Sequence, residues 1–458
     1  MAEYNRRKTI SVRVGNTSIG GDNPIRLQSM TTTATMDTQG CIEQAIRIIE
    51  AGGELVRMTT QGTREAENMR LIREGLTARG YNTPLVADVH FNPAVADVAA
   101  RYVEKVRINP GNYVDPARTF RHLEYTDDEY AQEIQRIRDR FIPFLNICRE
   151  HGTAIRIGVN HGSLSDRIMS RYGNTPAGMV ESCMEFLRIC VEQEFMNVVI
   201  SIKASNTVVM IETVRLLVKE MEREGMAFPI HLGVTEAGEG EDGRIKSAIG
   251  IGALLAEGIG DTIRVSLSEA PEREIPVARK LVDYAARSAQ VRASARIENG
   301  ILYLEYNDSL PEDFQLHAAM DAGALLIDGK AGDLKLTNPN MNAEQIRSTE
   351  EAILQGARIR FSKPEYISCP GCGRTLYNLE DTIARIKAAT GHLKGVKIAI
   401  MGCIVNGPGE MADADFGYVG AGRGRISLYR GKECIEKNIP EENAVDRLLK
   451  LIEETLHK

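Results

Sequence analysis

Eight short runs of β-branched and aliphatic residues, most of them about 30 residues apart, recur between residues 24 and 268. Each run ends in polar residues, and the segments between runs carry the i, i+3, i+4, i+7 apolar spacing of an amphipathic helix. The runs span 24–30, 55–60, 84–91, 105–111, 154–160, 198–204, 229–235 and 262–268. Eight strands that alternate with helices over about 250 residues predict an α/β fold, a (β/α)8 barrel of the TIM type. A doubly wound open sheet is the competing architecture.

The repeat ends near residue 290, so we expect the barrel to span residues 1–290. Residues 291–361 then hold two further strand-like segments, at 301–306 and 323–329, and a helical pattern at 342–357. These few elements are too short to close another barrel. We therefore predict a short α/β insertion at this place in the chain.

The chain changes character again at residues 362–458. A cysteine-rich turn precedes a helical pattern (381–390), a strand-like run (396–403), a glycine-rich loop and a terminal helical pattern (440–456). This order predicts a compact α+β domain. The glycine-rich loop, GAGRGR, does not follow a buried strand that opens a helix, so we interpret it as a hairpin turn and not as a phosphate loop.

Composition excludes several classes of function. Apolar residues make up 43% of the 458 residues and charged residues 26%, which suits a chain with a large core and excludes a disordered one. The 56 basic and 63 acidic residues leave a net charge of −7, so we expect no nucleic-acid partner. No stretch approaches the roughly 18 apolar residues of a membrane span, and no apolar segment follows the first basic residues. We expect a cytoplasmic protein with no membrane partner.

Polar residues occupy the ends of the predicted barrel strands, where the chemistry of such barrels takes place. They are Gln28, Ser29, Arg57, Asp88, His90, Arg107, Asn109, Arg156, Asn160, Lys203, Glu236, Arg264 and Ser266. Arginine offers a fork to phosphate and lysine a point charge, so cations on many strands predict a ligand with several phosphate oxygens. Any single arginine could instead point outward and pair with a helix carboxylate. Asp88, His90 and Glu236 are suited to orientation or proton transfer.

Three of the eight cysteines form a constellation in the last domain. Cys369 and Cys372 are separated by two residues, Cys403 follows after thirty more, and Glu410 lies seven positions beyond it. Three thiolates and a weaker ligand fit a [4Fe–4S] cluster with one open iron. A structural zinc site, which normally adds a fourth Cys or a His, and simple packing of buried thiols stay open as alternatives. The remaining cysteines are expected in the core, except for Cys434.

Several motifs closely resemble those of the 4-hydroxy-3-methylbut-2-enyl diphosphate synthase family. They are VRINPGN, IRIGVNHGSL, ISIKASN, HLGVTEAG, AIGIGALLAEGIGDTIRVSLS, YISCPGCG and MGCIVNGPGE. The resemblance covers residues 4–289 and 361–458. It implies a barrel that binds 2-C-methyl-D-erythritol 2,4-cyclodiphosphate, a domain that carries a [4Fe–4S] cluster, and reductive ring opening with loss of water. A phosphate-substrate aldolase or synthase, with Lys203 as a Schiff-base nucleophile and a structural zinc domain, is the alternative.

The resemblance also implies roles for individual residues. The metal ligands would be Cys369, Cys372, Cys403 and Glu410, and Glu236 would act at the reacting carbons. The substrate contacts would be Arg57, Asp88, Arg107, Asn109, Arg156, Asn160, Lys203 and Ser266. It further implies ferredoxin or flavodoxin as electron donor and a homodimer. The insertion is longer than in the two-domain form of the family and shorter than in the three-domain form, so the sequence leaves open whose barrel the cluster domain caps.

Overall fold

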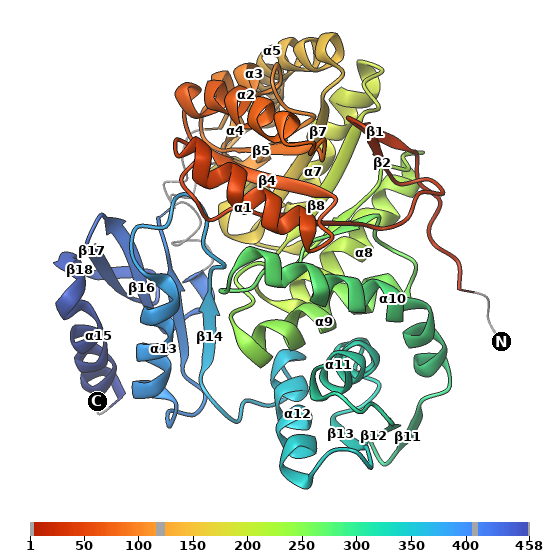
Figure 1. The fold of residues 1–458 in the computed structure, drawn as a ribbon, viewed down its shortest axis with the longest axis vertical. Helices are drawn as coiled ribbons and strands as arrows, with labels where there is room; N and C mark the ends of the chain where they lie inside the picture. The colour runs from red at the N-terminus through yellow and green to blue at the C-terminus, as the bar shows by residue number, and fades with distance from the viewer. Residues whose placement is uncertain (1–3, 116–123, 405–410, 457–458) are drawn as a thin grey trace.

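The structure, a computed structural model, describes residues 4–115, 124–404 and 411–456 (Figure 1). Eight strands form one sheet in the order β8-β7-β6-β5-β4-β3-β10-β9, and its pairs are parallel. They are β3 (Arg26–Met30), β4 (Leu55–Thr60), β5 (Leu85–Val89), β6 (Lys105–Ile108), β7 (Ala154–Asn160), β8 (Val198–Lys203), β9 (His231–Leu232) and β10 (Thr262–Ile263). A parallel bridge between Ile200 and Ile230 joins β8 to the residues before β9, so the sheet closes. The predicted barrel is confirmed, and each of the eight runs contains a strand.

Helices surround the barrel and bury both faces of its strands, as parallel sheets require. They are α1 (Thr38–Glu50), α2 (Thr63–Ala78), α3 (Pro93–Ala99), α4 (Pro110–Tyr113), α5 (Asp127–His151), α6 (Asp166–Tyr172), α7 (Pro176–Glu192), α8 (Thr207–Arg223), α9 (Gly240–Ala256) and α10 (Glu274–Ala293), with 3-10 turns at η1 (His161–Ser163) and η2 (Pro271–Arg273). Local signals set the ends of α5: a capping box joins Thr126 and Glu129, and Gly152 ends the helix in the left-handed region at φ 66°.

A hairpin closes the N-terminal end of the barrel, opposite the strand ends that carry the polar residues. It consists of β1 (Val12–Val14) and β2 (Thr17–Ile19). Its buried side chains pack against Leu55, Val86 and Val199, which lie at or near the beginning of their strands. Access to the barrel interior is therefore from the opposite end.

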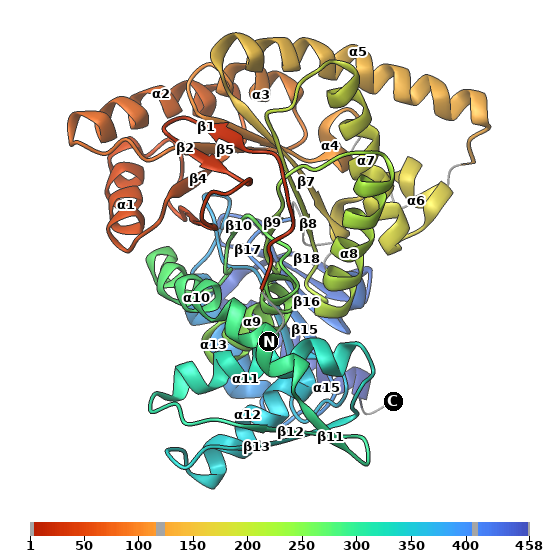
Figure 2. The ribbon, with the colours of Figure 1, turned by 90° about the vertical axis from the view of Figure 1, so that its right-hand side faces the viewer.

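The insertion forms a small α/β unit against α9 and α10 (Figure 2). Its elements are β11 (Arg296–Glu298), β12 (Ile301–Glu305), α11 (Pro311–Ile327), β13 (Asp333–Thr337) and α12 (Ala343–Gly356). The strand expected at 323–329 is wrong, because residues 323–327 end α11 and the strand comes later, as β13. Gly323 lets α11 approach α9 closely: a Cβ on it would lie 2.8 Å from Ile249. A short apolar run of this kind fits a buried helix as well as a strand.

The last domain is a five-stranded sheet in the order β14-β15-β16-β17-β18. The strands are β14 (Glu365–Ser368), β15 (Lys397–Met401), β16 (Phe416–Gly422), β17 (Arg425–Arg430) and β18 (Glu433–Pro440), accompanied by α13 (Leu379–Thr390), η3 (Met411–Asp413) and α15 (Glu441–Leu456). The first three strands are parallel and the last two pairs are antiparallel. GAGRGR forms the end of β16, the turn and the start of β17, so the hairpin interpretation is confirmed.

This domain closes over the barrel of its own chain (Figure 1). Ala237 of the barrel forms a parallel bridge with Ser368, and the Ser268 hydroxyl donates a hydrogen bond to the Cys369 carbonyl at 2.8 Å. The Lys246 ammonium donates to the Tyr366 carbonyl at 3.2 Å. The cysteine-bearing domain therefore caps the barrel of its own chain, a point that the sequence left open. No helix within the described ranges is long and apolar enough to cross a membrane.

Candidate active site

A cavity of about 100 Å³ lies where the barrel mouth meets the cysteine-bearing domain. This volume is several times the roughly 10–15 Å³ that one enclosed water requires. Its charged lining residues are Arg57, Asp88, Arg107, Arg156, Lys203, Glu236, Arg264 and Arg374. His90, Asn160, Ser266 and the three cysteines of the predicted constellation also line it. Cations outnumber carboxylates in this lining, as a polyanionic ligand requires.

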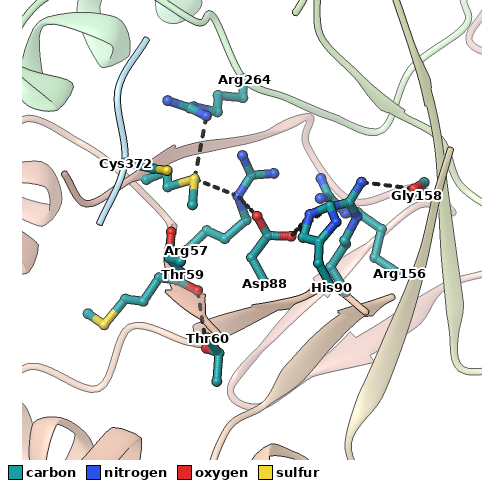
Figure 3. A network of polar contacts seen from close by, with 12 residues as sticks. Arg57, Thr59, Thr60, Asp88, His90, Arg156, Gly158, Arg264 and Cys372 are labelled. Carbon is teal, nitrogen blue, oxygen red and sulfur yellow. Dashed lines mark hydrogen bonds and ion pairs between the residues drawn. The ribbon is translucent and has the colours of Figure 1, made fainter. Parts of the chain in front are cut away.

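Asp88 organises two of the arginines, and Figure 3 shows its carboxylate between Arg57 and His90. Its carboxylate accepts from the Arg107 guanidinium at 2.8 Å, and the Arg57 Nε lies 3.9 Å away. Burial raises the pKa of Asp88, but these arginines outweigh it and hold the pKa well below its usual range. Arg107 also donates to the Gly158 carbonyl at 2.9 Å. Asp88 is therefore ionised and fixes both guanidinium groups toward the cavity.

His90 is buried beside the same arginine. Its ring contacts the Arg107 guanidinium, and the Asn112 amide lies 3.3 Å from its Nδ1. Burial, and then the charge of Arg107, holds the pKa of His90 well below its usual range. His90 is consequently a neutral imidazole that can orient a ligand or accept a hydrogen bond.

Arg156 and Lys203 are buried cations with no carboxylate partner among the residues described. Arg156 is 2% exposed, and its guanidinium contacts the His231 ring at 3.1 Å. Lys203 is 4% exposed, and burial together with Arg57 and Arg156 holds its pKa well below the usual range. A buried charge without a partner is costly, so such residues are kept for function more readily than for stability. An anionic ligand in the cavity would provide the missing partner.

Arg264 differs from these two because it is held by a carboxylate behind the cavity. Its Nε and Nη2 lie 2.9 and 2.8 Å from the two oxygens of Glu274. Glu274 also accepts from the Ser29 hydroxyl at 2.6 Å and from the Leu267 backbone N–H at 3.2 Å. The bidentate pair fixes the direction of the guanidinium. Glu274 does not line the cavity, so its role is to position Arg264.

Glu236 sits in a strained turn at the mouth. Its φ of 49° lies in the left-handed region, which is unusual for a residue other than glycine. Its side chain is 4% exposed, and Oε2 has no hydrogen-bond partner among the described residues. Burial raises the pKa of Glu236 to about 7, although Lys203 and Arg264 favour the ionised form. A carboxyl group with this pKa can carry or release a proton near neutral pH.

The three cysteines of the last domain reach the cavity from loops that follow two neighbouring strands. Cys369 and Cys372 follow β14, and Cys403 follows β15. The Cys369 sulfur accepts from the Gly402 N–H at 3.2 Å, and the Cys372 sulfur accepts from the Arg374 N–H at 3.4 Å. Backbone N–H groups directed at sulfur suit thiolate ligands of an iron–sulfur cluster, whose potential depends on such bonds.

No three Asp, Glu, His or Cys side chains in the described part of the chain are grouped closely enough to hold a single metal ion. Thiolates that bind one zinc ion converge to about 2.3 Å from it. The ligands of a cluster bind different irons, and the three cysteine sulfurs at this cavity, two of which accept backbone N–H groups, are a donor set that a cluster can use. Glu410, the predicted fourth ligand, lies outside the described residues.

Most of the predicted substrate residues line this one cavity, namely Arg57, Asp88, Arg107, Arg156, Asn160, Lys203 and Ser266. Asn109 does not line it. Its side chain caps α4, accepting from the Gly111 N–H at 3.1 Å, and donates to the Ser163 hydroxyl at 2.7 Å. The sequence analysis missed Arg374, whose guanidinium donates to the Asp88 carbonyl at 3.3 Å from the other domain. It also missed Met30, whose sulfur accepts from the Arg57 Nε at 3.2 Å.

Fold and site together define a class: barrel enzymes with a cation-lined mouth that is capped by a three-cysteine domain. The family model described as the GcpE TIM-barrel domain matches residues 9–279. The model of the GcpE protein C-terminal domain matches residues 365–454. The chain belongs to the GcpE family, so the resemblance seen in the motifs is confirmed.

Curated relatives align over nearly the whole chain, and each carries the name 4-hydroxy-3-methylbut-2-en-1-yl diphosphate synthase (flavodoxin). The relative from Phocaeicola vulgatus is 53% identical and covers 98% of both chains. Those from Akkermansia muciniphila and Protochlamydia amoebophila are 42% and 39% identical, over 98% of this chain and 97% and 96% of their own. The first alignment runs over 600 positions, so at least 142 of them are absent from this chain of 458 residues.

Proposed function

We propose that the chain converts 2-C-methyl-D-erythritol 2,4-cyclodiphosphate to 4-hydroxy-3-methylbut-2-enyl diphosphate. The ring C–O bond to the diphosphate breaks, and a hydroxyl group leaves as water. Two electrons and two protons enter for each molecule of product and water, which balances the reaction. The observation that carries the proposal is that the three cysteines and the cation-lined barrel mouth share a single cavity.

The cations of the mouth hold the substrate. We assign Arg156 and Lys203 to the diphosphate because they are buried without a carboxylate partner among the described residues. Arg57 and Arg107, held by Asp88, and Arg264, held by Glu274, complete the clamp. Each of these guanidinium groups is fixed before the substrate arrives, so little reorganisation is needed on binding. Asn160 and Ser266 add neutral hydrogen bonds from the same cavity wall.

Cys369, Cys372 and Cys403 are the proposed ligands of three irons of a [4Fe–4S] cluster, and Glu410 that of the fourth. When bound, such a cluster would supply single electrons, and an iron without a thiolate would be open to an oxygen ligand. Glu236 holds the proton that the leaving hydroxyl takes up, since its pKa of about 7 keeps a useful protonated fraction. Closure of the cysteine-bearing domain over the mouth excludes water around these groups.

Flavodoxin is the proposed electron donor, supported by the printed names of the relatives. The cytoplasm suits eight cysteines that form no disulfide in the described part of the chain, since its reducing conditions oppose disulfide formation. A homodimer stays an expectation from the resemblance, and the closure within one chain means that a second copy is not needed to complete the cavity. We assign substrate binding to residues 1–290, a scaffold role to the insertion at 291–361, and the cluster to 362–458.

The proposal is tested by anaerobic reconstitution with iron and sulfide, followed by turnover with reduced methyl viologen. The proposal predicts about four irons per chain, visible iron–sulfur absorbance, and formation of the linear diphosphate from the cyclic one. A colourless protein that binds one zinc ion and cleaves or joins carbon–carbon bonds would instead support the aldolase alternative. Identical turnover by iron-free protein would contradict the redox role of the cysteines.

A further inference from the structure

The glycine-rich hairpin between β16 and β17 lies at the same edge of its sheet as the cysteines. β14, β15 and β16 are parallel neighbours, so their C-terminal ends meet at one edge. Cys369 follows β14, Cys403 follows β15, and the turn at 422–425 follows β16. The proposed cluster and this turn are therefore close in space although nearly 20 residues separate Cys403 from Gly422 in the chain.

The end of β16 contacts the cysteine loop directly. A Cβ on Gly420 would lie 2.4 Å from the Gly402 carbonyl oxygen and 3.2 Å from the Tyr377 ring, so only glycine fits there. Gly402 is the residue immediately before Cys403, and the Tyr377 hydroxyl donates to the Met401 carbonyl at 3.1 Å. The backbone at the base of the hairpin therefore packs directly against the backbone of the cysteine loop, with no side chain between them. This contact explains Gly420, whereas Gly424 is explained by its φ of 64° in the turn.

The tip of the hairpin carries exposed positive charge. Arg423 and Arg425 are exposed, and so is Lys437 on the adjacent strand β18, next to Asn438, whose carbonyl accepts from Arg425 at 3.2 Å. No carboxylate in the described part of the chain pairs with these three residues. At the other end of β17, by contrast, Arg430 lies 3.4 Å from Glu433. We call Arg423, Arg425 and Lys437 the hairpin cations.

The net charge of the cysteine-bearing domain is more positive than that of the rest of the chain, which favours an anionic partner at this domain. Residues 362–458 contain 14 basic and 13 acidic residues, a net charge of +1, whereas the entire chain carries −7. Residues 1–361 therefore carry a net charge of −8, which does not favour an acidic partner. A partner with negative charge is steered away from the barrel and toward this domain.

We propose that the hairpin cations form the docking surface for the reduced flavodoxin, a small acidic protein. This inference rests on the proposed function, because that reaction needs an external one-electron donor. Electron transfer weakens steeply with distance, so the donor must dock at the edge of the domain that holds the cysteines. The barrel covers the side of Cys372 and Arg374, and the hairpin is an exposed part of this edge. Each encounter oxidises one flavodoxin hydroquinone to its semiquinone, and two encounters supply the two electrons.

The test reverses the charge of the hairpin in the full-length, cluster-loaded enzyme. Arg423→Glu/Arg425→Glu is compared with the wild type and with Lys432→Glu, an exposed lysine in the turn between β17 and β18. Turnover is measured at low ionic strength with reduced bacterial flavodoxin and, separately, with methyl viologen, a small cation that needs no acidic-protein docking surface. Binding of oxidised flavodoxin is measured by calorimetry, which does not depend on turnover.

The double variant should raise the KM for flavodoxin and weaken its binding about tenfold or more, and it should lose most of the salt dependence. Lys432→Glu should change either quantity less than about twofold. Turnover with methyl viologen, the KM for the cyclic diphosphate and the iron content should stay at wild-type values in both. Unchanged flavodoxin affinity in the double variant, or an equal loss with both donors, would overturn the docking assignment. Absence of turnover in the wild type with methyl viologen would instead refute the proposed function, and the calorimetry would still decide the docking surface.

Discussion

Lys203 offers a test in which activity and stability should move in opposite directions. It is 4% exposed at the cavity, and burial and four neighbouring arginines hold its pKa well below the usual range. In the free enzyme this buried amine, held near other cations, therefore destabilises the fold, whereas in the proposed complex it would bind the diphosphate. Lys203→Met keeps the length of the side chain and removes the charge.

The size of both effects follows from the contacts. One charge-assisted hydrogen bond contributes about 1.5–3 kcal/mol, and about 1.4 kcal/mol is tenfold in rate. Lys203→Met should therefore lower kcat/KM for the cyclic diphosphate at least about tenfold. Relief of the buried charge should raise the free energy of unfolding by about 0.5–2 kcal/mol. Steady-state kinetics with methyl viologen and urea unfolding of the same preparation measure the two quantities.

Lys105 provides the matched control. It is fully buried at the start of β6, its Nζ has no partner among the described residues, and it does not line the cavity. Burial and the charge of Arg156 also hold its pKa well below the usual range. Lys105→Met should stabilise the fold without reducing kcat/KM. Wild-type kinetics in Lys203→Met, or equal kinetic losses in both variants, would refute the phosphate clamp.

Three further predictions concern the other parts of the site. Cys369→Ser or Cys403→Ser should lose most of the bound iron and all turnover, whereas Cys434→Ser, at a half-buried cysteine on β18, should keep both; full iron content in the first two would remove those cysteines from the site. Turnover of the wild type should decline as the pH rises above about 7, because Glu236 loses its proton there. Glu236→Gln should turn over slowly and show no such decline, and a wild-type pH profile in that variant would exclude Glu236 as the proton donor. Glu274→Gln should raise the KM for the cyclic diphosphate about tenfold with unchanged iron content, since Arg264 loses its charged anchor; an unchanged KM would leave Arg264 without a positioning partner.

The barrel and most of its site could be predicted because strand periodicity and strand ends are local signals. A run such as VVISIK determines both a buried strand and the place of Lys203 at its end. The same strand pattern predicted that Arg57, Arg107 and Arg156 lie at one mouth of the barrel, and all three line the cavity there. Spacing alone likewise grouped Cys369 and Cys372, since two residues between them leave both in one turn.

The features that escaped prediction depend on contacts between distant segments. Arg374 reaches Asp88 only because the last domain closes over its own barrel, and no sequence pattern announces that contact. Residues 323–327 looked like a strand because the second half of α11 is almost entirely apolar, a consequence of its burial against α9. Asn109 stands at a strand end, as predicted, but its amide is used to cap α4 and to hold Ser163. Local patterns therefore predict the position of a residue on its strand or helix, but they do not predict which distant residue its side chain contacts.

The electron stoichiometry of product formation tests the central claim most directly. The cluster-loaded enzyme is mixed anaerobically with the cyclic diphosphate and with measured amounts of reduced methyl viologen, and the linear diphosphate is quantified. If the cysteines hold a redox cluster next to a phosphate clamp, the enzyme should consume about two electrons for each linear diphosphate that it forms. The iron-free protein should form no linear diphosphate. Product formation without electron consumption, or by the iron-free or zinc-loaded protein, would contradict it.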